Sequence, residues 1–251
     1  MPESLLATEG LSKRFGGVIA NEAIDLEVRR GDLHAIIGPN GAGKTTLLAQ
    51  LAGQLHPDRG VIRFAGKDVT HVPAHARARN GFGRSFQITN VVHELTARDN
   101  VALAVQALQS HSFRFWRRAR SDRSLLAPAE LVLHAVGLEQ CGDTLAGELS
   151  HGEKRALDIG MALATRPQLL LLDEPLAGMG AEDAPRIIKL LAGLKAQTTI
   201  LLIEHDMDAV FTLAEVVSVL VAGRIIASGP PAEIRKDAGV QRAYLGDEDE
   251  L

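Results

Sequence analysis

The chain has 251 residues, of which 46% are hydrophobic and 23% charged, as expected for one compact α/β domain with subdomains. Its formal net charge of −4 argues against a nucleic-acid partner, because binding to a phosphate backbone favours a basic surface. Cys141 is the single cysteine, so no internal disulfide can form, and a reducing compartment is indicated. No apolar stretch approaches the ~18 to 20 residues that cross a bilayer, and residues 1–10 do not resemble a signal peptide. We therefore expect any role at a membrane to depend on partner chains.

The first third of the chain combines an expected antiparallel strand layer with a strand–loop–helix unit. Apolar and acidic residues alternate over residues 24–28, which predicts a half-exposed strand. The apolar run Leu33–Ile37 predicts a buried strand, and a helix is expected at residues 45–52. A further strand is expected at residues 61–65.

The middle of the chain is compatible with helices. Apolar residues gather at helical spacing around residues 101–108 and again at 131–136. Between them lies the only charge run, residues 111–123, which contains five arginines. A solvated face is the simplest interpretation of this run. Contact with lipid headgroups or with a partner, helped by the aromatic residues within it, is the alternative.

The last third alternates strands and helices. Strands are expected at residues 169–172 and 198–203, with a helix at about 184–196 between them. Residues 216–221 and 225–227 predict a hairpin. This order, with apolar central strands, predicts an α/β fold in which helices cover a parallel sheet.

A complete phosphate-loop motif, GPNGAGKT, follows the expected strand Leu33–Ile37. Glycines permit a loop tight enough to wrap a phosphate, and successive backbone N–H groups then form an anion nest at the start of a helix. Lys44 is expected to reach the β- and γ-phosphates, and the Thr45 hydroxyl to hold Mg²⁺. We assign phosphate binding to Gly38, Pro39, Asn40, Gly41, Ala42, Gly43, Lys44, Thr45 and Thr46.

A second motif, LLLLDEP, ends an expected buried strand with two acids. Asp173 is placed to hold Mg²⁺, and Glu174 could orient or deprotonate an attacking water. Helix capping would explain an isolated acid at such a position. The phosphate loop about 130 residues upstream favours the catalytic interpretation.

A third motif, LSHGEKR, predicts the start of a helix, because Ser150 and Glu153 have capping-box spacing. Capping alone would explain these two residues. Gly152 weakens a helix at this point, so we expect something to approach the backbone closely there. A helix N-terminus with a serine and a glycine is suited to a phosphate.

His205 follows the expected strand at residues 200–204. In isolation it would be interpreted as a structural histidine. Because neighbouring parallel strands end at the same crevice, His205 could instead contact the γ-phosphate.

Five motifs thus follow one another: the phosphate loop, Gln87 in GRSFQ, LSHGE, LLLLDEP and His205. In this order they resemble the ABC transporter ATPase family over about residues 5–245. The resemblance implies a single domain, residues 1–251, with a P-loop NTPase (RecA-like) core built on a parallel sheet. It also implies an N-terminal antiparallel β subdomain and an α-helical subdomain inserted at about residues 89–164.

The resemblance implies ATP and Mg²⁺ as cofactors. Gln87 is expected to be a ligand of Mg²⁺ and of water that also reports to a membrane domain. Phe15 matches the aromatic residue that stacks on adenine. Glu174, His205, Lys44 and Gln87 are the expected catalytic residues.

The family works as a head-to-tail dimer, in which Ser150, Gly152 and Glu153 would face the ATP of a second subunit. This sequence differs from the usual LSGGQ signature at His151 and Glu153. Gly180 also stands where the family usually has an aspartate. A partner subunit with the standard residues could supply one fully standard site.

Within the family, the chain resembles the ATPase subunits of branched-chain amino acid importers. The supporting stretches are GRSFQITNVVHELTARDNVALAVQA, IEHDMDAVFTLAE and VQRAYLGDE. This implies transmembrane permease subunits, a second ATPase subunit, identical or different, and, indirectly, a periplasmic solute-binding protein. It also implies a peripheral location at the cytoplasmic face of the inner membrane. The resemblance does not determine the solute, which could also be urea, an amide or an aromatic acid.

Three alternatives to the importer remain. The sequence HARAR at residues 75–79 is similar to the lipopolysaccharide-export ATPase. A soluble ABC ATPase that moves no solute, such as an iron–sulfur assembly protein, has a similar length. A P-loop kinase or GTPase would leave Gln87, the LSHGE helix and His205 unexplained.

Overall fold

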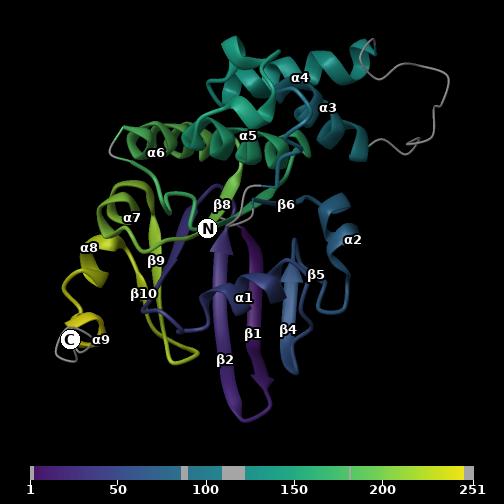
Figure 1. Ribbon diagram of the computed structural model, residues 1–251. Coiled ribbons are helices and arrows are strands. Elements are labelled where there is room, and N and C mark those ends of the chain that lie inside the picture. The colour runs from purple at the N-terminus through teal and green to yellow at the C-terminus, as the bar shows by residue number, and fades with distance from the viewer. Residues whose placement is uncertain (1–2, 86–89, 109–121, 181, 246–251) are drawn as a thin grey trace.

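Two sheets form the centre of the molecule (Figure 1). The computed structural model describes residues 3–85, 90–108, 122–180 and 182–245. In the larger sheet the strand order is β10-β9-β3-β8-β7-β6, with β6 to β9 and β3 parallel to one another and β10 antiparallel at the edge. Its strands are β3 (Leu33–Ile37), β6 (Phe82–Arg84), β7 (Leu169–Asp173), β8 (Thr199–Ile203), β9 (Val216–Val221) and β10 (Arg224–Gly229). The predicted parallel sheet and the terminal hairpin are confirmed.

The central strands are buried on both faces, and this explains their continuous apolar runs. Successive side chains of a strand point to opposite faces of the sheet. Leu170 and Leu172 of β7 accordingly join a core cluster with the helices on one face. Leu169 and Leu171 join a second cluster on the other face. Strands of this kind have no solvent-facing side on which polar residues would alternate.

The smaller sheet is antiparallel and has the order β2-β1-β4-β5. Its strands are β1 (Ser4–Phe15), β2 (Val18–Arg29), β4 (Arg59–Phe64) and β5 (Lys67–Asp68). The sequence predicted β2 and β4 in part but not β1. Gly10 interrupts β1 with a φ of 59°, and the pairing register shifts around it. Such an irregularity breaks the alternation by which a strand is recognised in a sequence.

The helices cover both faces of the larger sheet (Figure 1). Four helices share the core cluster of the first face: α5 (His151–Ala164) and α6 (Asp183–Leu194), and α3 (Ala97–Leu108) and α4 (Arg123–Ala135), which pack on α5. On the second face, α1 (Lys44–Leu51) is buried with residues of the antiparallel sheet. The remaining elements are α2 (Ala74–Arg79), α7 (Met207–Leu213), α8 (Pro231–Ile234), α9 (Ala238–Leu245), and the 3₁₀ turns Glu139–Cys141 and Ala146–Glu148.

The helices expected in the middle of the chain are confirmed as α3, α4 and α5. Their division from the core as a separate subdomain stays a prediction. Most of the basic run at residues 111–123 lies outside the described residues. Helices α2, α7, α8 and α9 were not predicted. Among the helices that the structure describes, none has both the length and the apolar character needed to span a membrane.

Candidate functional site

The phosphate-loop motif lies between β3 and α1, as the sequence predicted. Two of its glycines are required by close contacts with backbone carbonyl groups. A Cβ on Gly38 would lie 2.0 Å from the Leu220 oxygen, and one on Gly43 would lie 2.1 Å from the Ala20 oxygen. Gly43 also has a φ of 100°, which disfavours other residues. The loop is therefore fixed between the two sheets by its surroundings.

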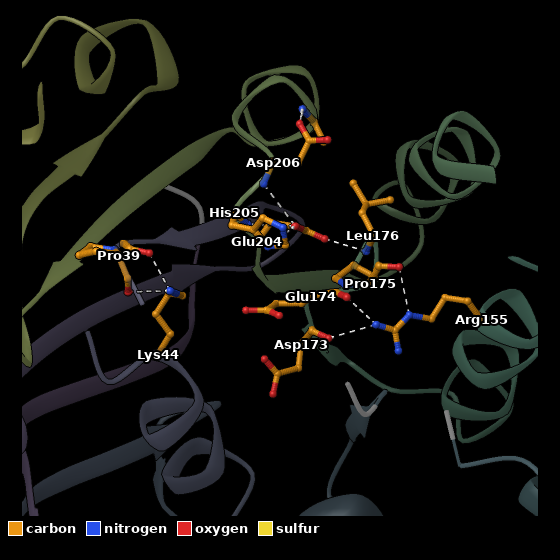
Figure 2. A network of polar contacts seen from close by, with 12 residues as sticks. Pro39, Lys44, Arg155, Asp173, Glu174, Pro175, Leu176, Glu204, His205 and Asp206 are labelled. Carbon is orange, nitrogen blue, oxygen red and sulfur yellow. Dashed lines mark hydrogen bonds and ion pairs between the residues drawn. The ribbon is translucent and has the colours of Figure 1, made fainter. Parts of the chain in front are cut away.

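Lys44 is buried at the start of α1, and its charge is held inside the loop (Figure 2). Its Nζ donates hydrogen bonds to the carbonyl oxygens of Gly38 at 2.6 Å and Pro39 at 3.0 Å. Burial lowers the pKa of Lys44, while the carboxylates of Glu174 and Asp173 act to raise it. A partly desolvated ammonium group in this position suits an anion with several negative charges, such as a triphosphate.

Asp173 and Glu174 end β7 at the same edge of the sheet as the phosphate loop. In the sheet register, Asp173 is paired with Ile203 of β8, and β8 is the neighbour of β3. The Glu174 N–H donates to the Ile203 oxygen at 2.9 Å. Glu174 has a φ of 47°, a conformation that costs free energy for a residue with a Cβ and is found most often at functional sites.

Asp173 is almost wholly buried, and among the described residues its Oδ1 atom has no hydrogen-bond partner. Burial raises the pKa of Asp173, and the guanidinium of Arg84, whose Nη2 is 3.6 Å from Oδ2, acts to lower it. A buried carboxylate oxygen without a partner is costly unless a cation occupies the place. Asp173 and the Thr45 hydroxyl therefore fit Mg²⁺, which prefers oxygen ligands and keeps few of them from the protein. No cluster of three or more His, Cys, Asp or Glu that could hold a metal occurs in the described part of the chain.

His205 follows β8, and Glu204 beside it is a buried residue of the site that the sequence did not reveal. The His205 ring is largely exposed, with Nδ1 3.6 Å from the Glu204 carboxylate. Glu204 is wholly buried and accepts hydrogen bonds from the N–H groups of Leu176 at 2.7 Å and His205 at 2.9 Å. Glu204 thus joins the end of β8 to the segment after β7 (Figure 2). The sequence offered one signal for Glu204, which is an acidic residue directly after an apolar strand.

Arg155 is the second residue that the sequence did not reveal. It lies on α5, is 2% exposed, and points at the turn after β7 (Figure 2). Its guanidinium donates to the carbonyl oxygens of Asp173 at 3.3 Å, Glu174 at 2.5 Å and Pro175 at 3.0 Å. Burial lowers the pKa of Arg155, and the nearby carboxylates, Asp158 first among them, act to raise it. Arg155 therefore holds the backbone of Asp173 and Glu174 against α5.

The LSHGE motif begins α5, and the predicted capping box is confirmed. Ser150 Oγ accepts from the Glu153 N–H at 3.2 Å, and the Glu153 carboxylate accepts from the Ser150 N–H at 2.8 Å. This second hydrogen bond is the main cause of a lowered Glu153 pKa. The negative charge of Glu153 is therefore directed back to Ser150, next to Gly152 in the same helical turn. Within the described residues, no hydrogen bond or ion pair joins this motif to the phosphate loop.

Phe15 is half exposed at the tip of the hairpin between β1 and β2. The Lys13 ammonium lies 5.6 Å from its ring centroid. Further along β2, the Asn21 side chain donates to the Gly43 oxygen at 3.2 Å. This hydrogen bond ties β2 to the phosphate loop, and the stacking role expected of Phe15 stays a prediction.

Gln87 lies outside the described residues, so its expected role stays a prediction. The residues on either side of that segment are both fixed to α5. Ser85 Oγ donates to the Asp158 carboxylate at 2.5 Å, and the Asn90 N–H donates to the same carboxylate at 3.3 Å. Asp158 and Ser85 are buried.

Comparisons with known proteins identify the family. The model described as "ABC transporter" matches residues 22–177, and the model described as "Branched-chain amino acid ATP-binding cassette transporter" matches residues 224–250. The chain is 36% identical to the high-affinity branched-chain amino acid transport ATP-binding protein BraF of Pseudomonas aeruginosa, over 98% of this chain and 100% of that protein. It is 34% identical to the lipopolysaccharide export system ATP-binding protein LptB of Acidithiobacillus ferridurans, over 97% of this chain and 98% of that protein.

The fold is shared with solved structures. The crystal structure of the ADP conformation of an ATP-binding cassette of an ABC transporter, MJ1267, has a TM-score of 0.86 and 31% sequence identity, and covers 97% of this chain and 99% of that chain. The predicted P-loop NTPase fold is thereby confirmed, and nucleotide binding by the chain is supported, while the roles of the individual site residues stay predictions. The chain belongs to the ABC transporter family and is an ATP-binding, ATP-hydrolysing subunit of that family.

Proposed function

We propose that this chain hydrolyses ATP to drive an importer of branched-chain amino acids or of a related small solute. The observation that carries the proposal is the match of its C-terminal residues 224–250 to the branched-chain amino acid family model, together with the likeness to BraF over nearly the whole chain. The ATPase subunit does not touch the cargo, so the residues of the site support the energy source rather than the identity of the solute.

The site supports a particular division of catalytic work. ATP would lie with its phosphates on residues 38–46 and its adenine on Phe15. Glu174 would orient or activate the water for in-line attack on the γ-phosphate. Lys44 and His205 would stabilise the charge that develops on that phosphate. Mg²⁺, held by Thr45, Asp173 and Gln87, would neutralise phosphate charge when bound.

A partner subunit is part of the proposal. The capped first turn of α5 offers backbone N–H groups to a phosphate, yet it has no polar contact with the phosphate loop among the described residues. The phosphate loop and the first turn of α5 are then two separate half-sites. Each could complete a nucleotide site with the other half-site of a second ATPase subunit, if the two subunits face each other head to tail. The chain would thereby bind two nucleotides jointly with an identical or a different partner.

A groove supports the binding of a permease subunit. It lies between α2, β6, α3 and α5, has a volume of about 350 Å³, and borders both flanks of the segment that contains Gln87. Its lining is largely apolar and includes Ala74, Ala78, Phe82, Ala104, Ala107 and Met161. A short amphipathic helix from a transmembrane partner would fit such a groove. The chain would then lie at the cytoplasmic face of the inner membrane, with the periplasmic solute-binding protein on the other side.

The lipopolysaccharide-export alternative loses one of its supports. Arg77 of the HARAR sequence is fully buried and donates to the carbonyl oxygens of Gln50 and Leu51 at the end of α1, and of Val69 and Thr70. Burial lowers its pKa to about 10. Arg77 thus has a structural role at the end of the helix that begins at the phosphate loop. The sequence HARAR therefore says little about the cargo.

The test is capture of the partners. Tagged Glu174→Gln protein would be incubated with ATP and detergent-solubilised membranes of its own source, and the captured proteins would be identified. The Lys44→Ala protein is the control, because its dimer should not close around ATP. Permease subunits of an amino acid importer are the expected result, and the associated binding protein can then be titrated with leucine, isoleucine and valine. Capture of soluble assembly proteins or of lipopolysaccharide-export components would overturn the importer assignment while leaving the ATPase intact.

A further inference from the structure

Gly152 is confined by another part of its own chain. A Cβ at this position would lie 2.4 Å from Oδ1, 2.6 Å from Cγ and 3.0 Å from Cβ of Asp183, the first residue of α6. Gly152 is buried and does not have a positive φ, so its backbone conformation does not require glycine. The requirement is spatial: the Asp183 side chain occupies the place that any larger residue would need.

Asp183 is well placed to hold this position. It lies in the first turn of α6 and against the first turn of α5, and the partial positive charges of both helix N-termini favour a carboxylate. The N–H of Asp183 also donates to the Gly180 oxygen at 3.1 Å. The contact therefore joins α5 to Gly180, the residue that stands in place of the usual aspartate.

Two described parts of the stretch after β7 contact α5. At its start, Arg155 of α5 donates to the carbonyl oxygens of Glu174 at 2.5 Å and Pro175 at 3.0 Å. At its end, Asp183 packs on Gly152. Between these points, His151 lies near Gly178, with its Nε2 3.9 Å from where a Cβ of that glycine would be. The described residues on either side of residue 181 thus both pack against α5.

We propose that Asp183 is a positioning residue that couples the catalytic acids of one subunit to the first turn of α5 in the same subunit. The inference rests on the proposed function, in which that turn faces the ATP of the partner. A displacement at Glu174 when the γ-phosphate leaves would then shift the half-site that α5 offers to the other nucleotide. On this view Gly152 serves a contact within its own chain, as well as any approach of the partner's phosphate.

A double-mutant cycle separates these two reasons for Gly152. The first readout is the ATP turnover number of the complex reassembled, with Glu174 intact, from the partners that the capture experiment identifies. The others are the ATP affinity and the melting temperature of the full chain alone. We expect Gly152→Ala to lower turnover about tenfold in the wild-type background and less than about threefold in the Asp183→Gly background, because that change removes the obstructing side chain. Asp183→Gly alone should lower turnover by about two- to fivefold, as the coupling contact is lost.

The matched control is Asp183→Asn, which keeps the shape of the side chain. Gly152→Ala should remain as damaging in the Asp183→Asn background as in the wild type. The ATP affinity of the isolated chain should stay within about twofold for every variant, because Asp183 does not touch the phosphate loop. A loss of affinity and of melting temperature together would indicate a general packing role and would overturn the proposal.

Two further outcomes are distinguishable. If Gly152→Ala lowers turnover equally in all three backgrounds, the glycine serves the partner's nucleotide alone, and the coupling role of Asp183 is wrong while the proposed function stands. If the wild-type chain captures no partner and shows no ATP-dependent association, the proposed function fails and this inference fails with it.

Discussion

The phosphate loop and the first turn of α5 both depend on glycine, but for different physical reasons. Gly38 and Gly43 face backbone carbonyl oxygens of β9 and β2, which belong to buried or paired strands and cannot move aside. Gly152 faces the Asp183 side chain rather than a backbone carbonyl, and the carboxylate of that side chain, though not its Cβ, can rotate. The loop is therefore a rigid site, whereas the α5 end is an adjustable one. This difference suits a protein that must hold one nucleotide firmly and meet a partner's nucleotide only in part of its cycle.

The largest expected effect separates binding from chemistry at the rigid site. Glu174→Gln should lower ATP turnover about a thousandfold, because the amide cannot take a proton from the attacking water. ATP affinity should be retained, since the change keeps the size of the side chain and leaves Lys44 and the phosphate loop unaltered. Turnover can be measured by phosphate release and affinity by calorimetry, with Glu182→Gln, an exposed acid at the start of α6, as the control. Normal turnover in the Glu174→Gln protein would remove Glu174 from its assigned role.

The rigidity of the loop can be tested by adding one methyl group. Gly43→Ala should lower the free energy of unfolding by about 3 kcal/mol or more, because a Cβ would collide with the Ala20 oxygen and the positive φ adds strain. Gly41→Ala is the matched control: its φ of 77° is also positive, but nothing lies within 4 Å of the added atom. Its cost should be about 1 kcal/mol. Urea unfolding of the nucleotide-free protein measures both, and equal costs would show that the close contact is unimportant.

The stability of the fold around β3, the strand that precedes the phosphate loop, should depend on pH. His34 of β3 is buried, Nε2 lies 2.8 Å from Ser218 Oγ, and burial lowers the His34 pKa to about 4. The unfolded chain, with an ordinary histidine pKa near 6.5, binds the proton more readily. Stability should therefore be complete above pH 6.5 and fall as the pH is lowered from 6.5 to 4, by about 3 kcal/mol at most.

Variant proteins can isolate the contribution of this histidine. Urea unfolding at several pH values should show the loss in the wild type and a smaller loss in His34→Gln. Other groups also titrate in this range, so the difference between the two proteins is the informative quantity. Identical pH profiles would mean that His34 is not held neutral in the fold.

The two regions also differ in how far the sequence could predict them. The phosphate loop, the two acids and the capping box are local patterns, and each lies in the structure at the end of the strand or the start of the helix where the sequence predicted it. Glu204 and Arg155 contact segments that are distant in the sequence, and no local spacing of residues predicts these contacts. The close approach expected at Gly152 is present, but its partner, Asp183, lies on a different helix. Strand β1 was missed because Gly10 disrupts its alternation, while the role of Gln87 stays a prediction.

The smallest expected effect concerns the adjustable site. Ser150→Ala removes the hydroxyl that accepts the Glu153 N–H, and should destabilise the chain by about 1 kcal/mol, or roughly 2 to 4 °C in melting temperature. Ser150→Thr keeps a capping hydroxyl and should cost less. Both can be compared with Gly43→Ala in the same thermal melt of the nucleotide-free protein. A loss as large as that of Gly43→Ala would show that the start of α5 is built as rigidly as the phosphate loop. A small loss in melting temperature together with a much larger loss of turnover would instead indicate that Ser150 acts mainly on the partner's nucleotide, which the adjustable first turn of α5 meets.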